Sequence, residues 1–329
     1  MGKQTYPTRF GFEAEFFGIS RHDAVDALRG AQFEAEDDGY HHEPVDYWRV
    51  TEDGSVSREA NELVSPILMR PPGFVTSGQV LTTLRLAGAE LDRSCGLHVH
   101  HDAHGMSVPD FARLMALWAT CQEQINRLLP TSRHSNTYAR PLEDRKHWYN
   151  YLQSYRSLSV LFGDLREDSI GRYHSVNLAS LPVHSTVEFR QHSGTLNGTK
   201  LRHWTLLTGA FMHRATDKML DPLTLEEPDD LESMFDILGL PIETRAYYVE
   251  RAIALTTKPD DEGADADHSD DYGDDEDNDY DEDEDNGDPH GSAFCCDHCH
   301  VVHSVCTTHN GDPAFGDNAC SHCSCVILS

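Results

Sequence analysis

The sequence predicts an α+β fold, because strand-like and helix-like patterns alternate through residues 10–257. Residues 10–17 and 96–101 alternate side chains with the two-residue period of strands. Residues 108–129 instead repeat their apolar side chains with the spacing of a helix that buries one face. After Thr257 the composition becomes strongly acidic and then rich in cysteine and histidine. A chain of 329 residues is long enough for one large domain or two.

Six segments have the residue pattern of strands. One of them leads into the turn-forming sequence at residues 52–55, and another is stopped by Pro71 and Pro72. The last two alternate well enough to be adjacent strands. The expected strands are residues 10–17, 47–50, 62–68, 96–101, 172–178 and 185–191.

Six further segments have the pattern of helices. Gly30 ends the first of them, and Pro241 interrupts the last. The apolar stripe of the long central helix, which includes Phe111 and Trp118, indicates ordinary packing rather than function. The polar residues 132–140 are expected to form a loop. The expected helices are residues 22–30, 75–91, 108–129, 147–161, 201–219 and 226–257.

The negative charge of the chain is concentrated in one tract. Of the formal net charge of −30, 18 negative charges lie between Asp260 and Asp288, where there is no lysine or arginine, which leaves −12 for the rest. A tract with dense charge and almost nothing to bury is expected to be a disordered linker. An acidic body is also a poor candidate for binding DNA, which requires a cationic surface.

Composition favours a cytoplasmic location. No apolar run approaches the roughly 20 residues of a membrane span. The start of the sequence has no signal-peptide apolar region, and Tyr6 breaks the myristoylation pattern. Only Cys95 and Cys121 precede residue 294, whereas seven cysteines crowd between Cys295 and Cys325. In a reducing compartment such a cluster favours metal binding over disulfides.

Four of the expected strands carry charged or imidazole side chains at alternate positions, and therefore on one face. Glu13 and Glu15 are two residues apart, as are His98 and His100. Carboxylates with one or two imidazoles suit hard cations such as Mg²⁺ or Mn²⁺, which relieve the repulsion between the acids. The candidate metal ligands are Glu13, Glu15, Asp53, Glu62, His98 and Glu188.

Three arginines are candidates for binding the phosphates of a nucleotide. A guanidinium can donate two parallel hydrogen bonds to phosphoryl oxygens. The chain has no glycine-rich phosphate loop, so metal ions and arginines would have to hold the phosphates. The candidate residues are Arg140, Arg172 and Arg190.

These segments resemble the motifs of the amidoligase family. The resemblance rests on Gly11-Phe12-Glu13-Ala14-Glu15, on Asp53 followed by Glu62-Leu63-Val64-Ser65-Pro66, on Gly96-Leu97-His98-Val99-His100 and on Thr186-Val187-Glu188-Phe189-Arg190, in that order. Tyr138-Ala139-Arg140 and Arg172-Tyr173 add to it. The similar region covers roughly residues 9–218. The family belongs to the carboxylate–amine ligases, which share the catalytic fold of glutamine synthetase and glutamate–cysteine ligase.

The resemblance implies a curved antiparallel sheet with metals in its concave face and helices packed outside. It implies that ATP phosphorylates a carboxylate to an acyl phosphate, which an amine then attacks. Neither substrate is specified, because no segment indicates a glutamate or ammonia pocket; each could be a small molecule, a peptide or a protein. By the same resemblance one metal would be held by Glu13, His98 and Glu188, another by Glu15 and Glu62, and a third would lie near Asp53. The implied catalytic residues are Arg190, Arg172 and His100.

Two other functions remain open from the sequence. One is a ligase-like scaffold without catalysis, and the retention of mutually repelling acids argues against it. The other is a metal-dependent hydrolase that uses His98, His100, His101 and Asp102, and this interpretation ignores the remaining charged segments. Five further histidines are expected on the surface or behind the ligands: His41, His42, His101, His104 and His192.

The C-terminal region is expected to bind zinc. Two Cys-x₂-Cys pairs are separated by 20 residues, which is typical of treble-clef or ribbon-like zinc sites and faintly similar to RING or PHD modules. The predicted ligands are Cys296, Cys299, Cys320 and Cys323; a second site would use His303, Cys306 and His309, with Cys295 or Cys325 as a fourth ligand. Such a module would contact a protein partner. The expected domains are residues 1–258 for catalysis, 259–289 for the linker and 290–329 for zinc.

Overall fold

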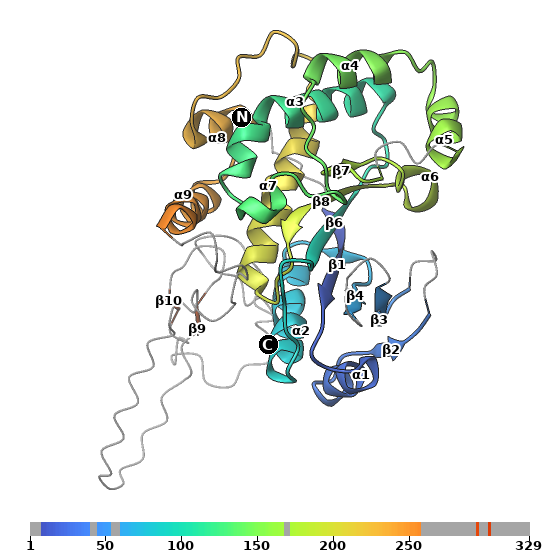
Figure 1. The fold of residues 1–329 in the computed structure, drawn as a ribbon, viewed down its shortest axis with the longest axis vertical. Helices are drawn as coiled ribbons and strands as arrows, with labels where there is room; N and C mark the ends of the chain where they lie inside the picture. Colours follow the sequence, from blue (N-terminus) through green and yellow to red (C-terminus); the bar gives the residue numbers. More distant parts are fainter. Residues whose placement is uncertain are drawn as a thin grey trace, which may run out of the picture. The chain divides into compact units, whose positions relative to one another are not determined.

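The computed structural model describes residues 8–39, 45–53, 60–167 and 172–257, and two short strands near the C-terminus. The described residues of the first unit form an eight-stranded sheet in the order β2-β3-β4-β1-β6-β8-β7, with β5 paired to β1 (Figure 1). Every pair is antiparallel except β2 with β3. The strands are β1 (Arg9–Phe16), β2 (Ala35–Asp37), β3 (Trp48–Asp53), β4 (Ala60–Val64), β5 (Leu68–Met69), β6 (Gly96–Asp102), β7 (Val176–Asn177) and β8 (Thr186–Ser193). The predicted α+β class and the largely antiparallel sheet are confirmed.

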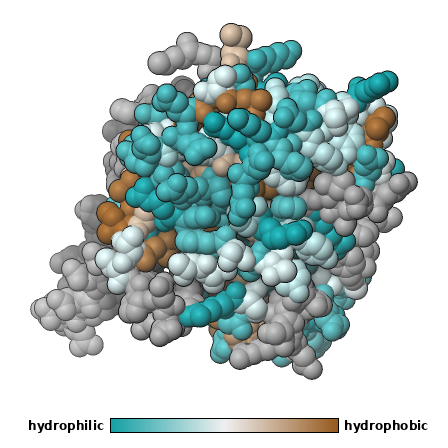
Figure 2. Space-filling view, turned by 45° about the horizontal axis from the view of Figure 1, so that its top comes forward, coloured by the Kyte–Doolittle hydropathy of each residue, from teal (hydrophilic) through white to brown (hydrophobic). Residues whose placement is uncertain are grey.

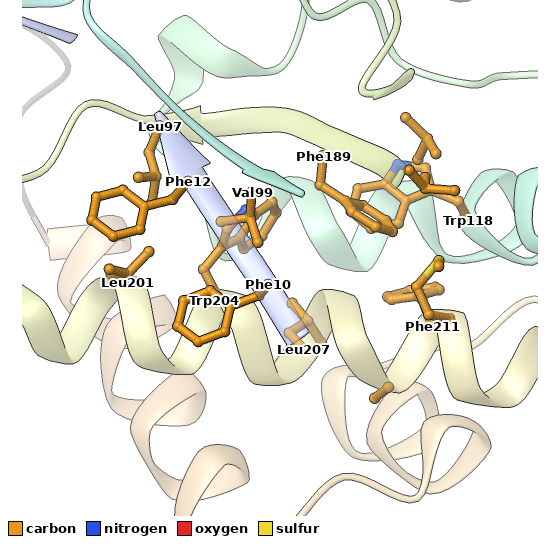
Figure 3. Packing of buried hydrophobic residues seen from close by; sticks show 14 of the residues in the cluster. Phe10, Phe12, Leu97, Val99, Trp118, Phe189, Leu201, Trp204, Leu207 and Phe211 are labelled. Atoms are coloured by element: carbon orange, nitrogen blue, oxygen red, sulfur yellow. The ribbon is translucent and has the colours of Figure 1, made fainter. Parts of the chain in front are cut away.

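Helices cover one face of this sheet. Trp118 of α3 and Trp204 of α7 meet edge to face, with ring centroids 6.1 Å apart, and the ring of Phe189 from β8 lies 5.2 Å from Trp118. Figure 3 shows Phe12 and Val99 from the strands beside residues of α7. The helices are α1 (Arg21–Gly30), α2 (Pro72–Leu86), α3 (Val108–Asn126), α4 (Arg145–Gln153), α5 (Leu158–Glu167), α6 (Leu181–His184), α7 (Gly198–Ala215), α8 (Leu231–Leu238) and α9 (Ile242–Thr257), with a 3₁₀ turn at Thr131–Arg133.

The alternation of side chains along the strands sends apolar groups to this helix-covered face. Phe10, Phe12 and Ala14 of β1 are buried in the core, whereas Glu13 and Glu15 project from the other side. Full burial of each such aromatic side chain contributes roughly 1.5–3 kcal/mol. The core therefore fixes which residues of each strand are left to face the opposite side.

A pair of glycines lets two of the covering helices approach closely. A Cβ atom added at Gly198, the first residue of α7, would lie 2.5 Å from the Cα of Gly78 in α2. No side chain fits at that distance, so glycine is required where α2 and α7 cross. The two helices lie side by side in Figure 1.

Some expected elements differ from the structure. The helix expected at residues 147–161 is two helices, α4 and α5, because Ser154 donates its hydroxyl to the carbonyl of Tyr151 and Ser157 accepts from the amide of Val160. The strand expected at residues 172–178 is shortened to β7, since residues 172–173 form a turn. The strand expected at residues 62–68 is divided into β4, which ends at Val64, and β5, which begins at Leu68. No expected element corresponds to β2 or α6.

The C-terminal part of the chain forms a second unit, Tyr272–Ser329. There β9 (Phe294–Cys295) pairs antiparallel with β10 (Val302–His303). The acidic tract and the predicted zinc ligands fall outside the residues with described side chains, so the linker, the zinc module and the boundaries at residues 258 and 289 stay predictions.

On the face drawn in Figure 2 hydrophilic side chains predominate, and the hydrophobic ones form small separate patches. Among the described helices, none combines the length and the apolar character needed to cross a membrane.

Candidate metal and phosphate site

Strand register brings the acids and imidazoles of four strands onto the face of the sheet opposite the core formed with α3 and α7. Glu13 of β1 lies directly opposite His98 of β6, and His100 of β6 lies opposite Glu188 of β8. On the other side of β1, Glu15 is the partner of Glu62 in β4. Side chains of directly paired residues project to the same face, so segments distant in sequence meet there.

Two groups of potential ligands share Glu13. Within each group the ligand atoms lie within 4.8 Å of one another: Glu13 with Glu62 and His98, and Glu13 with His100 and Glu188. One carboxylate oxygen of Glu13 is 3.2 Å from Nδ1 of His98, and the other is 3.2 Å from Nε2 of His100. Glu13 is therefore placed to bridge two cations.

The electrostatics of the second group favour the ionised form of its two carboxylates. Burial raises the pKa of Glu13, but the charge and hydrogen bond of His100 and those of His98 together hold it well below its ordinary value. Burial lowers the pKa of His100, but the charge and hydrogen bond of Glu13, together with the charge of Glu188, outweigh it, so that the net shift of this pKa is upward. The pKa of Glu188 is lowered in spite of burial, chiefly by Arg190. Without a cation these groups neutralise one another.

Glu188 is held from two sides. The Nδ2 group of Asn177 in β7 donates a hydrogen bond of 2.5 Å to its Oε2, and the guanidinium of Arg190 forms an ion pair with its Oε1. Arg190 also donates from Nε to the carbonyl of Tyr138, 3.3 Å away. The sequence led us to expect that Arg190 reaches a phosphoryl oxygen; in the structure it contacts its own strand neighbour. The sequence did not identify Asn177 as a residue that orients Glu188.

Glu15 has surroundings of its own. Its Oε2 accepts a 2.6 Å hydrogen bond from the amide of Gly96, and its Oε1 lies 3.6 Å from Nε2 of His98. The buried Arg133 faces it; burial lowers the pKa of this guanidinium to about 10, although Glu15 opposes the shift. Glu15 and Glu62 thus lie side by side, but Glu15 belongs to neither of the two ligand groups.

Arg133 enters the site from the 3₁₀ turn and was missed in the sequence. Its Nε and a terminal nitrogen donate to the carbonyls of Gln191 and Arg190, at 3.1 and 3.0 Å. β6 and β8 also change register opposite His98, between Leu97 and Val99. Arg133 therefore binds β8 at the point where the pairing of β8 with β6 is irregular. This is a tertiary contact, which a sequence pattern does not predict.

The other predicted site residues are less closely gathered. Arg140 is exposed and joins His174 through a β-bridge, and Arg172 lies in the turn just before it. Both are at the β7 edge of the sheet, next to β8. Asp53 ends β3, and its side chain is not described. Their assignment to a third metal and to nucleotide phosphates stays a prediction.

Two histidines expected on the surface or behind the ligands lie in the core. The ring of His101 is fully buried and its Nε2 is 2.8 Å from Oγ1 of Thr208 in α7, and the buried His192 packs on Trp204. Because His101 follows His100 directly, the strand period sends the two rings to opposite faces. A hydrolase site that combines His98, His100 and His101 is therefore not assembled.

Comparison with known proteins agrees with this arrangement. Residues 6–212 match the family model described as "Putative amidoligase enzyme". The chain belongs to the amidoligase family. It is accordingly a ligase by family, and the matched region contains all four motif strands of the site. No curated protein was found to match the sequence.

Two solved structures resemble the amidoligase chain weakly. One is described as "Crystal structure of novel glutamine synthase homolog", with 14% identity over 77% of this chain and 68% of that chain. The other is described as "GmaS/ADP complex-Conformation 1", with 13% identity over the same shares. At a TM-score of 0.38 for each, neither similarity defines the fold.

The donor set of this amidoligase fits a divalent cation. Two carboxylates, those of Glu62 and Glu188, and two imidazoles surround Glu13, and the oxygen-rich character of this set suits Mg²⁺ or Mn²⁺. Next to Glu13 and His100 the protein has a cavity of about 270 Å³. The cations Arg9 and Arg49 line it, and neither was singled out in the sequence.

Proposed function

We propose that the protein is an ATP-dependent carboxylate–amine ligase that works through an acyl phosphate. The observation that supports this most is the shared position of Glu13 between two ligand groups on one face of the sheet. A pair of cations bridged by one carboxylate is suited to binding a polyphosphate, because each ion meets oxygens of the phosphate chain. The cations would neutralise the charge of the phosphoryl group in transfer.

The balanced reaction has two steps. A carboxylate oxygen of the acid substrate attacks the γ-phosphorus of ATP, so that an acyl phosphate forms and ADP leaves. The amine nitrogen then attacks the acyl carbon, the amide bond forms, phosphate leaves with the C–O bond electrons, and the amine gives up a proton. Both steps place negative charge on oxygens beside the ligand groups.

The residues of the chain have separate parts in this scheme. Glu13, Glu62, His98, His100 and Glu188 would hold the cations. Asn177 orients Glu188 through its hydrogen bond, and Arg190 is close enough to exchange its ion pair with Glu188 for a phosphoryl oxygen once cations neutralise that acid. Arg140 and Arg172 would contact the outer part of the nucleotide, from the β7 edge.

Hydroxylamine trapping tests the proposal. The protein is incubated with ATP, Mg²⁺, hydroxylamine and a panel of carboxylic acids; an acyl phosphate converts to a hydroxamate, which is detected by mass. Hydroxamate formed in step with ADP, and only with ATP present, is the expected result. An enzyme that binds Mg²⁺ and ATP but forms ADP without any acid, or amide without ADP, would contradict the acyl-phosphate route.

A further inference from the structure

A histidine–aspartate pair, His104 with Asp102, lies beside the ligand groups. Asp102 follows His100 by two residues in β6, so both side chains project to the same face of the sheet, about 7 Å apart along the strand. Asp102 and His104 line the cavity that Glu13 and His100 also border. Neither residue of the pair is a member of the two ligand groups. The pair is therefore next to the metal ligands and separate from them.

Asp102 holds the ring of His104 in one orientation. Its Oδ1 accepts hydrogen bonds from the backbone amide of His104, at 3.0 Å, and from Nδ1 of the ring. Its Oδ2 accepts from Nε and a terminal nitrogen of Arg9, at 2.9 and 2.6 Å. Because an ionised carboxylate can only accept hydrogen bonds, Nδ1 of His104 carries a hydrogen, and the neutral ring then has its lone pair on Nε2.

The Nε2 side of this ring is open to the cavity and to solvent. The side chain of His104 is 67% exposed, and its contacts within the described residues are those with Asp102. His100, in contrast, has Nδ1 3.2 Å from Oγ1 of Thr186 and Nε2 3.2 Å from Glu13. An imidazole titrates near neutral pH, so a ring with one accessible nitrogen can take up a proton and release it to water.

We propose that His104 is the general base that deprotonates the amine substrate, and that Asp102 is a positioning residue that orients the ring for this step. The inference rests on the proposed function. An alkyl amine is mostly protonated at neutral pH and then lacks the lone pair with which to attack. Nε2 of His104 takes one proton from the ammonium nitrogen, which attacks the acyl carbon of the acyl phosphate. The C–O bond breaks, and the second proton goes to the phosphate that leaves.

Two kinds of nucleophile test this on the full-length protein, with the acid that hydroxylamine trapping identifies. Primary amines from a panel that includes ammonium chloride must lose a proton before they attack, whereas hydroxylamine is largely unprotonated at neutral pH. His104→Gln should slow amide formation by about 10²–10⁴-fold, the usual contribution of a general base, and should slow hydroxamate formation much less. His22→Gln removes an exposed imidazole that is paired with Asp26 in α1, and should affect neither product.

Nitrogen-15 NMR of the histidine rings gives a readout that does not depend on turnover. Neutral His104 should carry its hydrogen on Nδ1, and Asp102→Asn, whose amide can donate to the ring, should remove this restriction and slow amide formation. A neutral ring with its hydrogen on Nε2 overturns the proposal.

The kinetic outcomes separate this proposal from the reaction on which it rests. Amide formation in His104→Gln as fast as in His22→Gln, with hydroxamate still formed, would refute the general base and leave the ligase reaction standing. An unchanged protein that forms neither hydroxamate nor amide would refute the ligase reaction and the base together.

Discussion

The two faces of β6 give neighbouring histidines opposite properties. His100 faces acids, and although burial alone would lower its pKa, Glu13 raises it above the ordinary value. His101, the next residue, faces the helices, where burial and then the charge of Arg70 lower its pKa to about 3. One ring is stabilised as a cation and the other as a neutral core group. The environment of the face, and not the residue type, decides which.

β1 and β8 repeat this division. In β1, Phe12 directly precedes Glu13, and in β8, Phe189 lies between Glu188 and Arg190. Each aromatic side chain is buried on the core face. The core face supplies the free energy that holds the strands in register, and the register assembles the ligand groups. Substitutions on the two faces should therefore separate stability from chemistry.

The largest effect is expected on the core face. Phe189→Ala removes a fully buried ring that packs on Trp118, and should lower the free energy of unfolding by about 3–5 kcal/mol in urea titration. Leu86→Ala, at a residue 75% exposed, is the matched control and should change it by no more than about 0.5 kcal/mol. A cost at Phe189 as small as the control's would mean that this face does not hold the sheet.

On the opposite face, the neighbouring Arg190 should affect rate rather than stability. Arg190→Lys keeps the charge and loses the planar fork, so kcat should fall by about 10²–10³, or roughly 3–4 kcal/mol, with nearly unchanged ATP affinity. Single-turnover ADP formation and a separate nucleotide titration measure the two. The exposed Arg85→Lys serves as the control. Unchanged turnover in Arg190→Lys would reduce Arg190 to an ion-pair partner of Glu188.

The core side also predicts a pH dependence. Burial, and then the charge of Arg202, lower the pKa of His203 in α7 to about 4. As pH falls, the unfolded chain takes up this proton near pH 6.5 before the folded protein does, so stability is lost between about pH 6.5 and 4. His203→Phe, which keeps the stacking on Tyr247, should reduce that loss by about 3 kcal/mol in urea titrations at pH 7 and 4. A pH dependence equal to that of the exposed-site variant His22→Gln would show that His203 is not kept neutral.

The smallest effect concerns the support of a ligand. Asn177→Ala removes the hydrogen bond to Glu188 and should weaken Mn²⁺ binding by about 10–100-fold, because groups behind a ligand orient it. Isothermal titration measures the affinity. Only the affinity for Mn²⁺ should fall, and the melting temperature of the protein should change little. Unaltered affinity would indicate that Arg190 alone positions Glu188.

The sequence predicts the strands of the site well because their chemistry follows the two-residue period. Glu13, His98 and Glu188 could each be placed on a polar face from their own segment alone. Their order across the sheet could not, since pairing of β1 with both β4 and β6 is decided by the core. The same two-residue period places His101 on the core face, opposite to His100, so its burial also follows from the sequence.

Other features depend on contacts that sequence patterns do not encode. Arg133 comes from a segment that was expected only to be a loop, and it reaches the site through carbonyl groups of β8. The break at residues 154–157 follows from serine hydrogen bonds that compete locally with helical ones.

Cation binding by Glu13 is the central claim, and Mn²⁺ binding followed by electron paramagnetic resonance tests it most directly. The unchanged protein should bind Mn²⁺ at two sites that share Glu13. Glu13→Gln should lose both while keeping its melting temperature, and the exposed Glu123→Gln should behave as the unchanged protein. Full Mn²⁺ binding by a folded Glu13→Gln protein would contradict the account.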